Sequence, residues 1–143
     1  LDLFSRRIVG WSMQSRQTTN VVLQALLAAV WRRKPKGRVL VHSDQGSQFT
    51  SMEWASFLKH HDLEPSMSRR GNCWDNACME RFFCSLKTEW IGDTIYPTRE
   101  AATTAVFEYI ETFYNTKRRH ASLGYKTPAQ YEAQAHSQAQ HAA

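Results

Sequence analysis

The sequence predicts a single α/β domain, and three observations lead to that prediction. The apolar run Val39–Val41 ends in a polar turn that contains Gly46, a pattern typical of a buried strand. Three longer segments, at about 18–33, 50–60 and 98–114, repeat apolar residues at helical spacing. Helices that alternate with strands favour an open α/β sheet, which binds its ligands beyond the carboxyl ends of its strands. Asp44 occupies that position in the sequence.

At the front, residues 1–14 contain two apolar patches on either side of Ser5-Arg6-Arg7. We expect the end of one strand, a tight turn and a second, antiparallel strand. Asp2 is the only acidic residue before Asp44. We interpret it as a strand-end or turn carboxylate that pairs with Arg6 or Arg7, and the alternative is a metal ligand.

The next segment predicts a helix from the caps at residues 18–20 to about Arg33. Its apolar face would consist of Val22, Leu23, Leu26, Leu27, Val30 and Trp31. Five cations follow within seven residues: Arg32, Arg33, Lys34, Lys36 and Arg38. They form either a solvated helix end that suits the helix dipole or a surface for phosphate.

Two shorter elements surround residue 60. Thr50-x-x-Glu53 is a capping box that predicts a helix of about ten residues. His60 and His61 follow at its end, where we expect a dipole or solvent role. Residues 63–68 then favour a short strand, and Pro65, which lacks a backbone donor, indicates a sheet edge or an irregular connection.

A helical pattern carries Glu80, with Asp75 as its cap and apolar positions at Phe82, Phe83, Leu86 and Trp90. Lys87 follows Glu80 by two helical turns and shares its face. Asn76 lies one turn before Glu80. We expect it to support the carboxylate or a metal-bound water, or else to serve as a cap.

The last third predicts a helix that Thr98 caps and that ends near Tyr114. Its apolar stripe is expected in the core and consists of Ala102, Ala105, Val106, Tyr109, Ile110 and Phe113. A basic loop with Arg118, Arg119 and His120 follows, and Thr127-Pro128 begins a short final helix. These three basic residues either contact DNA or pair with Glu108 or Glu111. We expect the domain to cover residues 1–134 and residues 135–143 to form a disordered tail.

Composition restricts the class of protein less sharply than the sequence patterns do. The chain has 143 residues and a formal net charge of +5, with 42% hydrophobic residues, which is typical of one soluble, globular domain. No apolar run approaches the ~20 residues of a membrane span. A polyanionic partner is consistent with the charge. The spacing of Cys73, Cys78 and Cys84 lacks the Cys-x2-Cys knuckle of structural zinc sites, so we expect free thiols in a reducing cytoplasm.

The chemistry that these residues suggest begins with Asp44 and Glu80. Two carboxylates supplied by a strand end and a helix can bind a hard divalent cation through oxygen and leave positions open for phosphate and water. Two such metals about 3.5–4 Å apart can activate a hydroxyl and stabilise the leaving oxygen of a phosphodiester. Lys87 on the same helical face is placed to contact phosphate.

Four ordered segments resemble a known family. The first is Leu1–Trp11, and His42-Ser43-Asp44-Gln45-Gly46-Ser47-Gln48-Phe49 is the second. The others are Asp75-Asn76-Ala77-x-x-Glu80-x-Phe82-Phe83-x-x-Leu86-Lys87 and Tyr114-Asn115-x-x-Arg118-x-His120-x-x-Leu123-Gly124-Tyr125-x-Thr127-Pro128. Together they resemble the OrfB-type transposases of bacterial insertion sequences. Asp44 and Glu80 match the second and third residues of the DDE signature, and 35 residues (45–79) lie between them.

The resemblance implies a ribonuclease H-like fold similar to the catalytic core of retroviral integrase. It also implies a bacterial, cytoplasmic enzyme that uses Mg²⁺ or Mn²⁺ to cleave and transfer DNA strands in transposition and integration. The first Asp of the signature would precede Leu1, so we expect this chain to be the carboxyl-terminal part of a longer protein, truncated at the N-terminal strand and inactive alone.

By the same resemblance, Asp44 and Glu80 are catalytic metal ligands. The expected DNA contacts are Lys87, Arg69, Arg70, Arg118, Arg119 and His120. The partners implied are transposon ends and target DNA, bound by a homo-oligomer. Two alternatives remain: an inactive remnant that only binds DNA or another transposase copy, and a nuclease of the same fold that cuts without joining.

Overall fold

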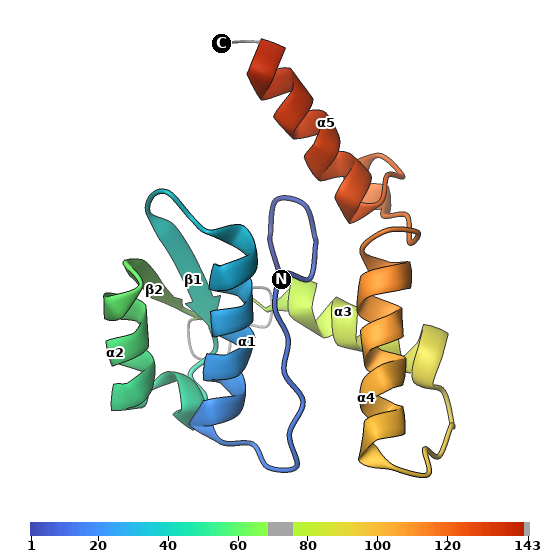
Figure 1. Cartoon of the computed structure of the whole chain (residues 1–143), viewed down its shortest axis with the longest axis horizontal. Coiled ribbons are helices and arrows are strands. Elements are labelled where there is room, and N and C mark those ends of the chain that lie inside the picture. The colour runs from blue at the N-terminus through green and yellow to red at the C-terminus, as the bar shows by residue number, and fades with distance from the viewer. Residues whose placement is uncertain (69–75, 142–143) are drawn as a thin grey trace. The chain divides into compact units, whose positions relative to one another are not determined.

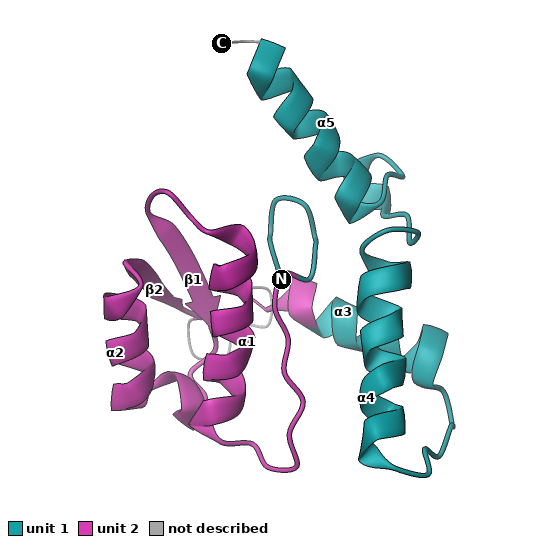
Figure 2. Cartoon of the chain, in the orientation of Figure 1, with its two compact units in different colours: residues 1–8, 80–143 teal, residues 9–79 magenta. Residues whose placement is uncertain are grey.

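The computed structural model describes residues 1–68 and 76–141. These residues divide into two compact units (Figure 2), and the single domain over residues 1–134 stays a prediction. Unit 1 comprises Leu1–Ile8 with Glu80–Ala143, and unit 2 comprises Val9–Met79. Asp75, Arg69 and Arg70, for which we predicted a helix cap and two DNA contacts, lie outside the described residues.

Unit 2 contains a two-stranded parallel sheet joined by a crossover helix. The strand β1 (Val39–Ser43) pairs with β2 (Leu63–Met67) in the register Val39↔Leu63 to Ser43↔Met67. The helix α2 (Met52–His60) connects them, because parallel strands require a crossover (Figure 1). Both predicted strands are confirmed. The expected burial of β1 is wrong in its first half, since Leu40 is 60% exposed and β2 is its one strand neighbour among the described residues.

The helix α1 (Thr19–Arg33) confirms the predicted segment, and a short 3-10 turn (Ser47–Phe49) precedes α2. The core of unit 2 contains Trp54, Leu58 and Leu63, with α1 residues Val22, Leu23, Leu26 and Val30 packed against them. The predicted face of α1 was too wide, because Trp31 is 73% exposed. Ser51 rather than Thr50 caps α2: its hydroxyl accepts the Trp54 backbone N–H at 3.2 Å. A cap must stand directly before the first helical residue, which here is Met52.

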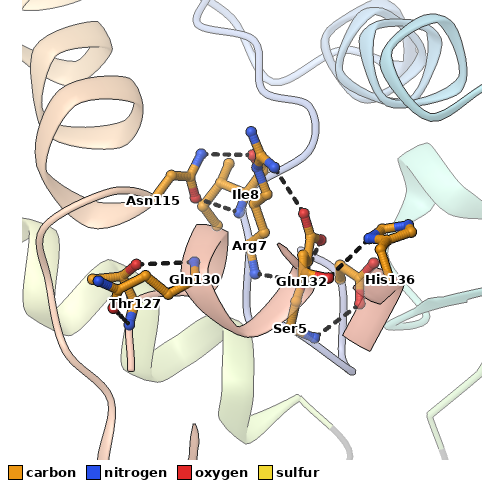
Figure 3. Close-up of polar contacts among 9 residues, drawn as sticks. Ser5, Arg7, Ile8, Asn115, Thr127, Gln130, Glu132 and His136 are labelled. Atoms are coloured by element: carbon orange, nitrogen blue, oxygen red, sulfur yellow. Dashed lines mark hydrogen bonds and ion pairs between the residues drawn. The ribbon is translucent and has the colours of Figure 1, made fainter. Parts of the chain in front are cut away.

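No strand occurs among described residues 1–14, so the predicted hairpin is wrong. Residues 2–7 instead form a turn closed by the Asp2 N–H and the Arg7 carbonyl at 2.8 Å. The Asp2 carboxylate lies in this turn as predicted, where Oδ1 accepts the backbone N–H groups of Phe4 and Ser5, and its pairing with an arginine stays a prediction. Ile8 pairs with a side chain rather than with a strand: its N–H and C=O bond to the Asn115 amide at 2.9 and 3.0 Å (Figure 3).

Unit 1 is built from helices. They are α3 (Ala77–Leu86), which begins in unit 2 and continues into a π-helical segment (Lys87–Ile91), and α4 (Arg99–Phe107), which continues into a second one (Glu108–Tyr114). Thr98 caps α4 as predicted, by accepting the Ala101 N–H at 3.1 Å. A 3-10 turn (Ala121–Leu123) and α5 (Pro128–His141) follow.

The core of unit 1 confirms part of the predicted stripe: Tyr109 and Ile110 are buried, at 0% and 1% exposure, while its other members are half-buried. At its end, Tyr114 is buried instead of Phe113. The π-helical turn explains this shift, because the Asn115 N–H reaches back five residues to Ile110 and the wider turn moves the inward position by one. Phe82 packs edge-on against Tyr114 at 5.0 Å, whereas Phe83 is 50% exposed, contrary to its predicted packing role.

The final helix is longer than predicted. Thr127 is its cap as expected: its Oγ1 accepts the Gln130 N–H, and Gln130 Oε1 accepts the Thr127 N–H (Figure 3). Instead of the disordered tail expected from residue 135, α5 extends to His141, and residues 142–143 lie outside the described part. Residues 133–141 are rich in Ala and Gln, which favour helix without an apolar face.

Buried polar contacts fix residues 1–8 to α5 within unit 1. Glu132, 6% exposed, accepts the Ser5 hydroxyl and the Arg7 guanidinium, each at 2.7 Å (Figure 3). A charge at that depth is stable only when it is paired and hydrogen-bonded. Among the described residues, no helix has the length and apolar character needed to span a membrane.

Candidate functional site

Asp44 follows the last residue of β1 and is exposed, as the sequence predicts. Its Oδ1 accepts the Gly46 N–H at 2.8 Å, which fixes the carboxylate over the turn. A Cβ atom at position 46 would lie 2.9 Å from Asp44 Oδ1 and from Gln48 Oε1. Glycine therefore leaves space for the carboxylate to fold back over the backbone, while the second carboxylate oxygen stays available.

Ser68 connects the residues on either side of Asp44. Its backbone N–H donates to the Ser43 carbonyl at 2.9 Å, and its own carbonyl accepts from Gln45 Nε2 at 3.2 Å. Ser68 itself is 5% exposed, whereas Gln45 is exposed and its bond to the Ser68 carbonyl is partly buried. The turn that carries Asp44 is thus held from both sides by one residue that follows β2.

His42 lies two residues before Asp44 and is half-buried. Its ring nitrogens face two hydroxyls, with Nδ1 2.9 Å from Ser66 Oγ and Nε2 3.3 Å from Ser68 Oγ. The ring therefore bridges β1 to β2 and to the residue after β2. Its polar atoms are engaged inside unit 2.

Glu80 belongs to α3 and is exposed. The residue before this helix, Asn76, accepts the Ser68 hydroxyl at Oδ1 (3.1 Å) and the Met79 N–H at its backbone carbonyl (3.0 Å). Asn76 therefore closes the first turn of α3, one turn ahead of Glu80.

Asp44 belongs to unit 2 and Glu80 to unit 1. Carboxylate oxygens are the donors that Mg²⁺ and Mn²⁺ prefer, so the chemistry of the two side chains fits such an ion. Among residues 1–68 and 76–141, no three His, Cys, Asp or Glu side chains gather around one metal position.

The predicted DNA contacts that the structure describes all lie in unit 1. Lys87 and Arg119 are exposed. Arg118 is more enclosed: its guanidinium donates to both carboxylate oxygens of Glu89, at 2.7 and 2.6 Å, and to Ser85 Oγ at 3.1 Å. The sequence predicted Glu108 or Glu111 as the partner. The partner is Glu89 because the π-helical segment after α3 presents that carboxylate to Arg118.

Electrostatics around Arg118 agree with this pairing. Its hydrogen bonds lower the pKa of Glu89, and burial against that carboxylate raises the pKa of the Tyr109 hydroxyl, which donates to Glu89 at 3.2 Å. His120 packs edge-on against Tyr114 at 5.0 Å. Burial, followed by the charge of Arg118, lowers the pKa of His120.

The sequence reasoning missed Ser68 and Glu89. Ser68 stands directly after a predicted strand, where polar residues meet the carboxyl end of a parallel neighbour, and that position was a usable signal. No comparable signal marked Glu89, because the direction of its side chain depends on a π-helical turn, which the spacing of apolar residues does not reveal.

Two comparisons of sequence place the chain in a family. The integrase core domain family matches residues 1–73, and a second integrase core domain family matches residues 61–128. The chain is 48% identical over 132 residues to the transposase for insertion sequence element IS904 of Lactococcus lactis. That match covers 92% of this chain and 52% of the transposase.

A second relative is the transposase InsF for insertion sequence IS3fB of Escherichia coli, 46% identical over 134 residues, which are 94% of this chain and 46% of that protein. The chain thus spans about half the length of the curated relatives that it matches. These matches confirm the resemblance to insertion-sequence transposases.

Solved structures agree on the fold. The catalytic core domain of BIV integrase matches with a TM-score of 0.60 and 23% identity, over 87% of this chain and 78% of that domain. A chain of the simian T-cell lymphotropic virus intasome in complex with the PP2A regulatory subunit B56 gamma matches with a TM-score of 0.60 and 19% identity. That match covers 82% of this chain and 41% of the intasome chain. The predicted ribonuclease H-like fold is confirmed. Since the first family match alone covers half of its residues, the chain belongs to the integrase core domain family.

Proposed function

We propose that this chain carries catalytic-core residues of a transposase, which cleaves and joins DNA strands in transposition and integration. The observation that carries the proposal is Asp44, an exposed carboxylate fixed over the turn that follows β1, within the residues that the integrase core family matches. The similarity of 92% of the chain to an insertion-sequence transposase supports DNA as the substrate.

Asp44 and Glu80 are the two side chains that we assign to Mg²⁺ or Mn²⁺. Both are exposed carboxylates with oxygen donors of the kind these ions bind. A metal bound there would stabilise negative charge on a phosphodiester and lower the pKa of a bound water or hydroxyl. The protein contributes fixed donors: Gly46 holds the Asp44 carboxylate, and α3 supports Glu80. A hydroxyl of water or DNA would attack, so no covalent bond to the protein is needed.

We assign the DNA contacts to exposed cations. Lys87 lies seven residues after Glu80 along the same helix, and Arg119 lies next to the Arg118–Glu89 pair. Both are placed to offer charge to phosphate without first losing an ion pair that the structure shows. Arg118 would act mainly by supporting the helices. Arg69 and Arg70 are proposed from the sequence alone. By the family resemblance, we also propose that a homo-oligomer assembles on the transposon ends and target DNA.

The test uses the purified chain with end-labelled duplexes that carry the termini of the insertion sequence in which its gene lies, and with Mg²⁺ or Mn²⁺. Joined, branched products support strand transfer. Cleavage without joined products would instead identify a nuclease. Duplex binding with neither product is what we expect of a chain that is inactive alone, and the absence of duplex binding would contradict the proposal. In each case Asp44→Asn is the matched control, because it removes charge from the carboxylate without changing its shape.

A further inference from the structure

Ser68 uses every polar group that it possesses, and its partners lie on both sides of the proposed site. The backbone groups bond to Ser43 and Gln45, the two neighbours of Asp44. The hydroxyl lies 3.1 Å from Asn76 Oδ1, directly before the helix that carries Glu80. All of these partners belong to unit 2. No sequence motif identifies Ser68, and the proposed metal chemistry does not require it as a ligand.

The single hydroxyl proton decides the direction of the hydrogen bonds. Ser68 Oγ lies 3.1 Å from both the Ser43 carbonyl and Asn76 Oδ1, and it has one proton for two acceptors. The Ser43 carbonyl already accepts the Ser68 N–H at 2.9 Å. We therefore assign the hydroxyl proton to the hydrogen bond with Asn76 Oδ1, because the Ser43 carbonyl already accepts one hydrogen bond from Ser68.

The remaining contacts of Ser68 follow from that assignment. With its proton directed to Asn76, Ser68 Oγ accepts from His42 Nε2 at 3.3 Å. In a neutral imidazole the other nitrogen is then an acceptor, so the Ser66 hydroxyl donates to His42 Nδ1 at 2.9 Å. One directed chain results, from Ser66 through His42 and Ser68 to Asn76. Every donor along it points toward α3.

We propose that Ser68 is a positioning residue of the site, which fixes the first turn of α3 and the turn after β1 through this directed chain. The inference rests on the proposed function, which assigns a metal to Asp44 and Glu80. Of the two segments that Ser68 anchors, one carries Asp44 and the other leads into Glu80. The buried hydroxyl contributes no ligand. It restricts the motion of the backbone from which each carboxylate projects.

The first experiment is amide hydrogen exchange on the full chain, followed by NMR for wild type, Ser68→Ala and Asn76→Ala. The Met79 N–H, which bonds to the Asn76 carbonyl, is expected to exchange roughly five- to tenfold faster in either variant, the effect of losing one hydrogen bond. In the double variant the two effects should not multiply, because both substitutions remove the same bond. Ser122→Ala, at an exposed serine, is the matched control and should change nothing.

A second readout tests positioning itself. Mn²⁺ alone is titrated into each variant, and the broadening of the Gln45 and Gly46 amide signals is followed. Ser68→Ala should need several-fold more Mn²⁺ for half-maximal broadening than Ser122→Ala does. The Trp54 amide, bonded to Ser51, reports whether each variant has folded. Asn76→Ala offers the same test at a less buried position.

Unchanged exchange at Met79 in Ser68→Ala would overturn the proposed chain of bonds. Faster exchange combined with unchanged Mn²⁺ dependence would overturn the positioning role. Failure of the proposed function looks different from either result: wild type itself would then show no Mn²⁺ broadening around Asp44, while the exchange data would still decide whether the bonds exist. The nitrogen chemical shifts of His42 supply an independent check, since they should report a proton on Nε2.

Discussion

Arg118 and Glu89 form a two-point ion pair, with Nε and Nη2 donating to the two carboxylate oxygens at 2.7 and 2.6 Å. Tyr109 donates to the same carboxylate, and Arg118 also lies over the Tyr114 ring at 5.7 Å. The pair joins the π-helical segment after α3 to the loop that follows Tyr114. Arg118 is therefore engaged in the fold of unit 1.

Arg118→Ala should lower the free energy of unfolding by about 1–2 kcal/mol, since it removes charged hydrogen bonds from a partly exposed pair. Arg119→Ala is the matched control: its side chain is exposed, so stability should stay within about 0.5 kcal/mol of wild type. Urea denaturation measures both. Equal stability of the two variants would contradict the structural role of Arg118.

The same pair has a predictable acid dependence. Arg118 lowers the folded-state pKa of Glu89, so the stabilisation is present above the ordinary glutamate pKa and disappears as pH falls through the folded value. The stability difference between wild type and Glu89→Gln should therefore shrink in acid. Glu53→Gln, on α2 in the other unit, provides the comparison. A difference that stays constant down to about pH 3 would be inconsistent with the ion pair.

His120 predicts a second pH effect. Burial, Arg118 and Arg6 all lower its folded-state pKa from 6.5, Glu89 opposes them, and Tyr114 packs against the ring. The unfolded chain therefore binds the proton more readily, and stability should fall as pH drops from about 7 to about 5. His120→Gln should flatten this dependence, while His141→Gln, exposed near the end of α5, should not. Identical pH profiles for wild type and His120→Gln in thermal denaturation would refute the assignment.

Asn115→Asp should destabilise the chain by about 3 kcal/mol or more, through the loss of one buried hydrogen bond and the burial of a charge. Asn115 is 1% exposed, and its amide accepts from the Ile8 N–H and donates to the Ile8 carbonyl. Aspartate keeps the acceptor but loses the donor, which leaves the Ile8 carbonyl without that bond. Asn20→Asp makes the same change at an exposed position in the first turn of α1 and should be nearly neutral. Comparable melting temperatures for the two variants would contradict the buried pairing.

Gly10→Ala should be strongly destabilising, because a Cβ there would lie 2.1 Å from the Ala25 carbonyl oxygen and 2.6 Å from the Ala29 nitrogen. Both are backbone atoms of α1, which cannot move aside cheaply, so we expect a loss of about 2 kcal/mol or more. At Gly37 nothing lies within 4 Å of the position that a Cβ would occupy, and Gly37→Ala should be neutral or slightly stabilising. Chemical denaturation of both variants makes the comparison, and a neutral Gly10→Ala would show that residue 10 does not pack on α1.

The sequence predicted the elements whose signals are local. The cap at Thr98, the cap at Thr127 and the strand before Asp44 each depend on a few adjacent residues, and the structure contains all three. The hairpin prediction failed because residues 1–14 alternate well enough for a strand, yet Ile8 bonds to Asn115, 107 residues away. A contact of that separation leaves no trace in local periodicity.

The site was predictable in part for the same reason. Asp44 and Glu80 were predicted from the strand end and the family motifs, and their role stays a prediction. Ser68 supports the Asp44 turn through hydrogen bonds with partners 23 and 25 residues away, which composition and spacing do not indicate. The π-helical turns likewise shifted the inward positions of two helices, so Tyr114 replaced Phe113 in the core and Glu89 became the partner of Arg118.

The most direct test of the account is Mn²⁺ titration followed by NMR on wild type, Asp44→Asn and Glu80→Gln. The account predicts broadening around both carboxylates in wild type and its loss at Gln45 and Gly46 in Asp44→Asn, with the fold intact. Asp62→Asn makes the equivalent change at an exposed aspartate with positive φ. In this variant the Gln45 and Gly46 amide signals should broaden with Mn²⁺ as they do in wild type. Broadening that persists at Gln45 in Asp44→Asn, or that centres elsewhere on the chain, would contradict the assignment of Asp44 as a metal ligand.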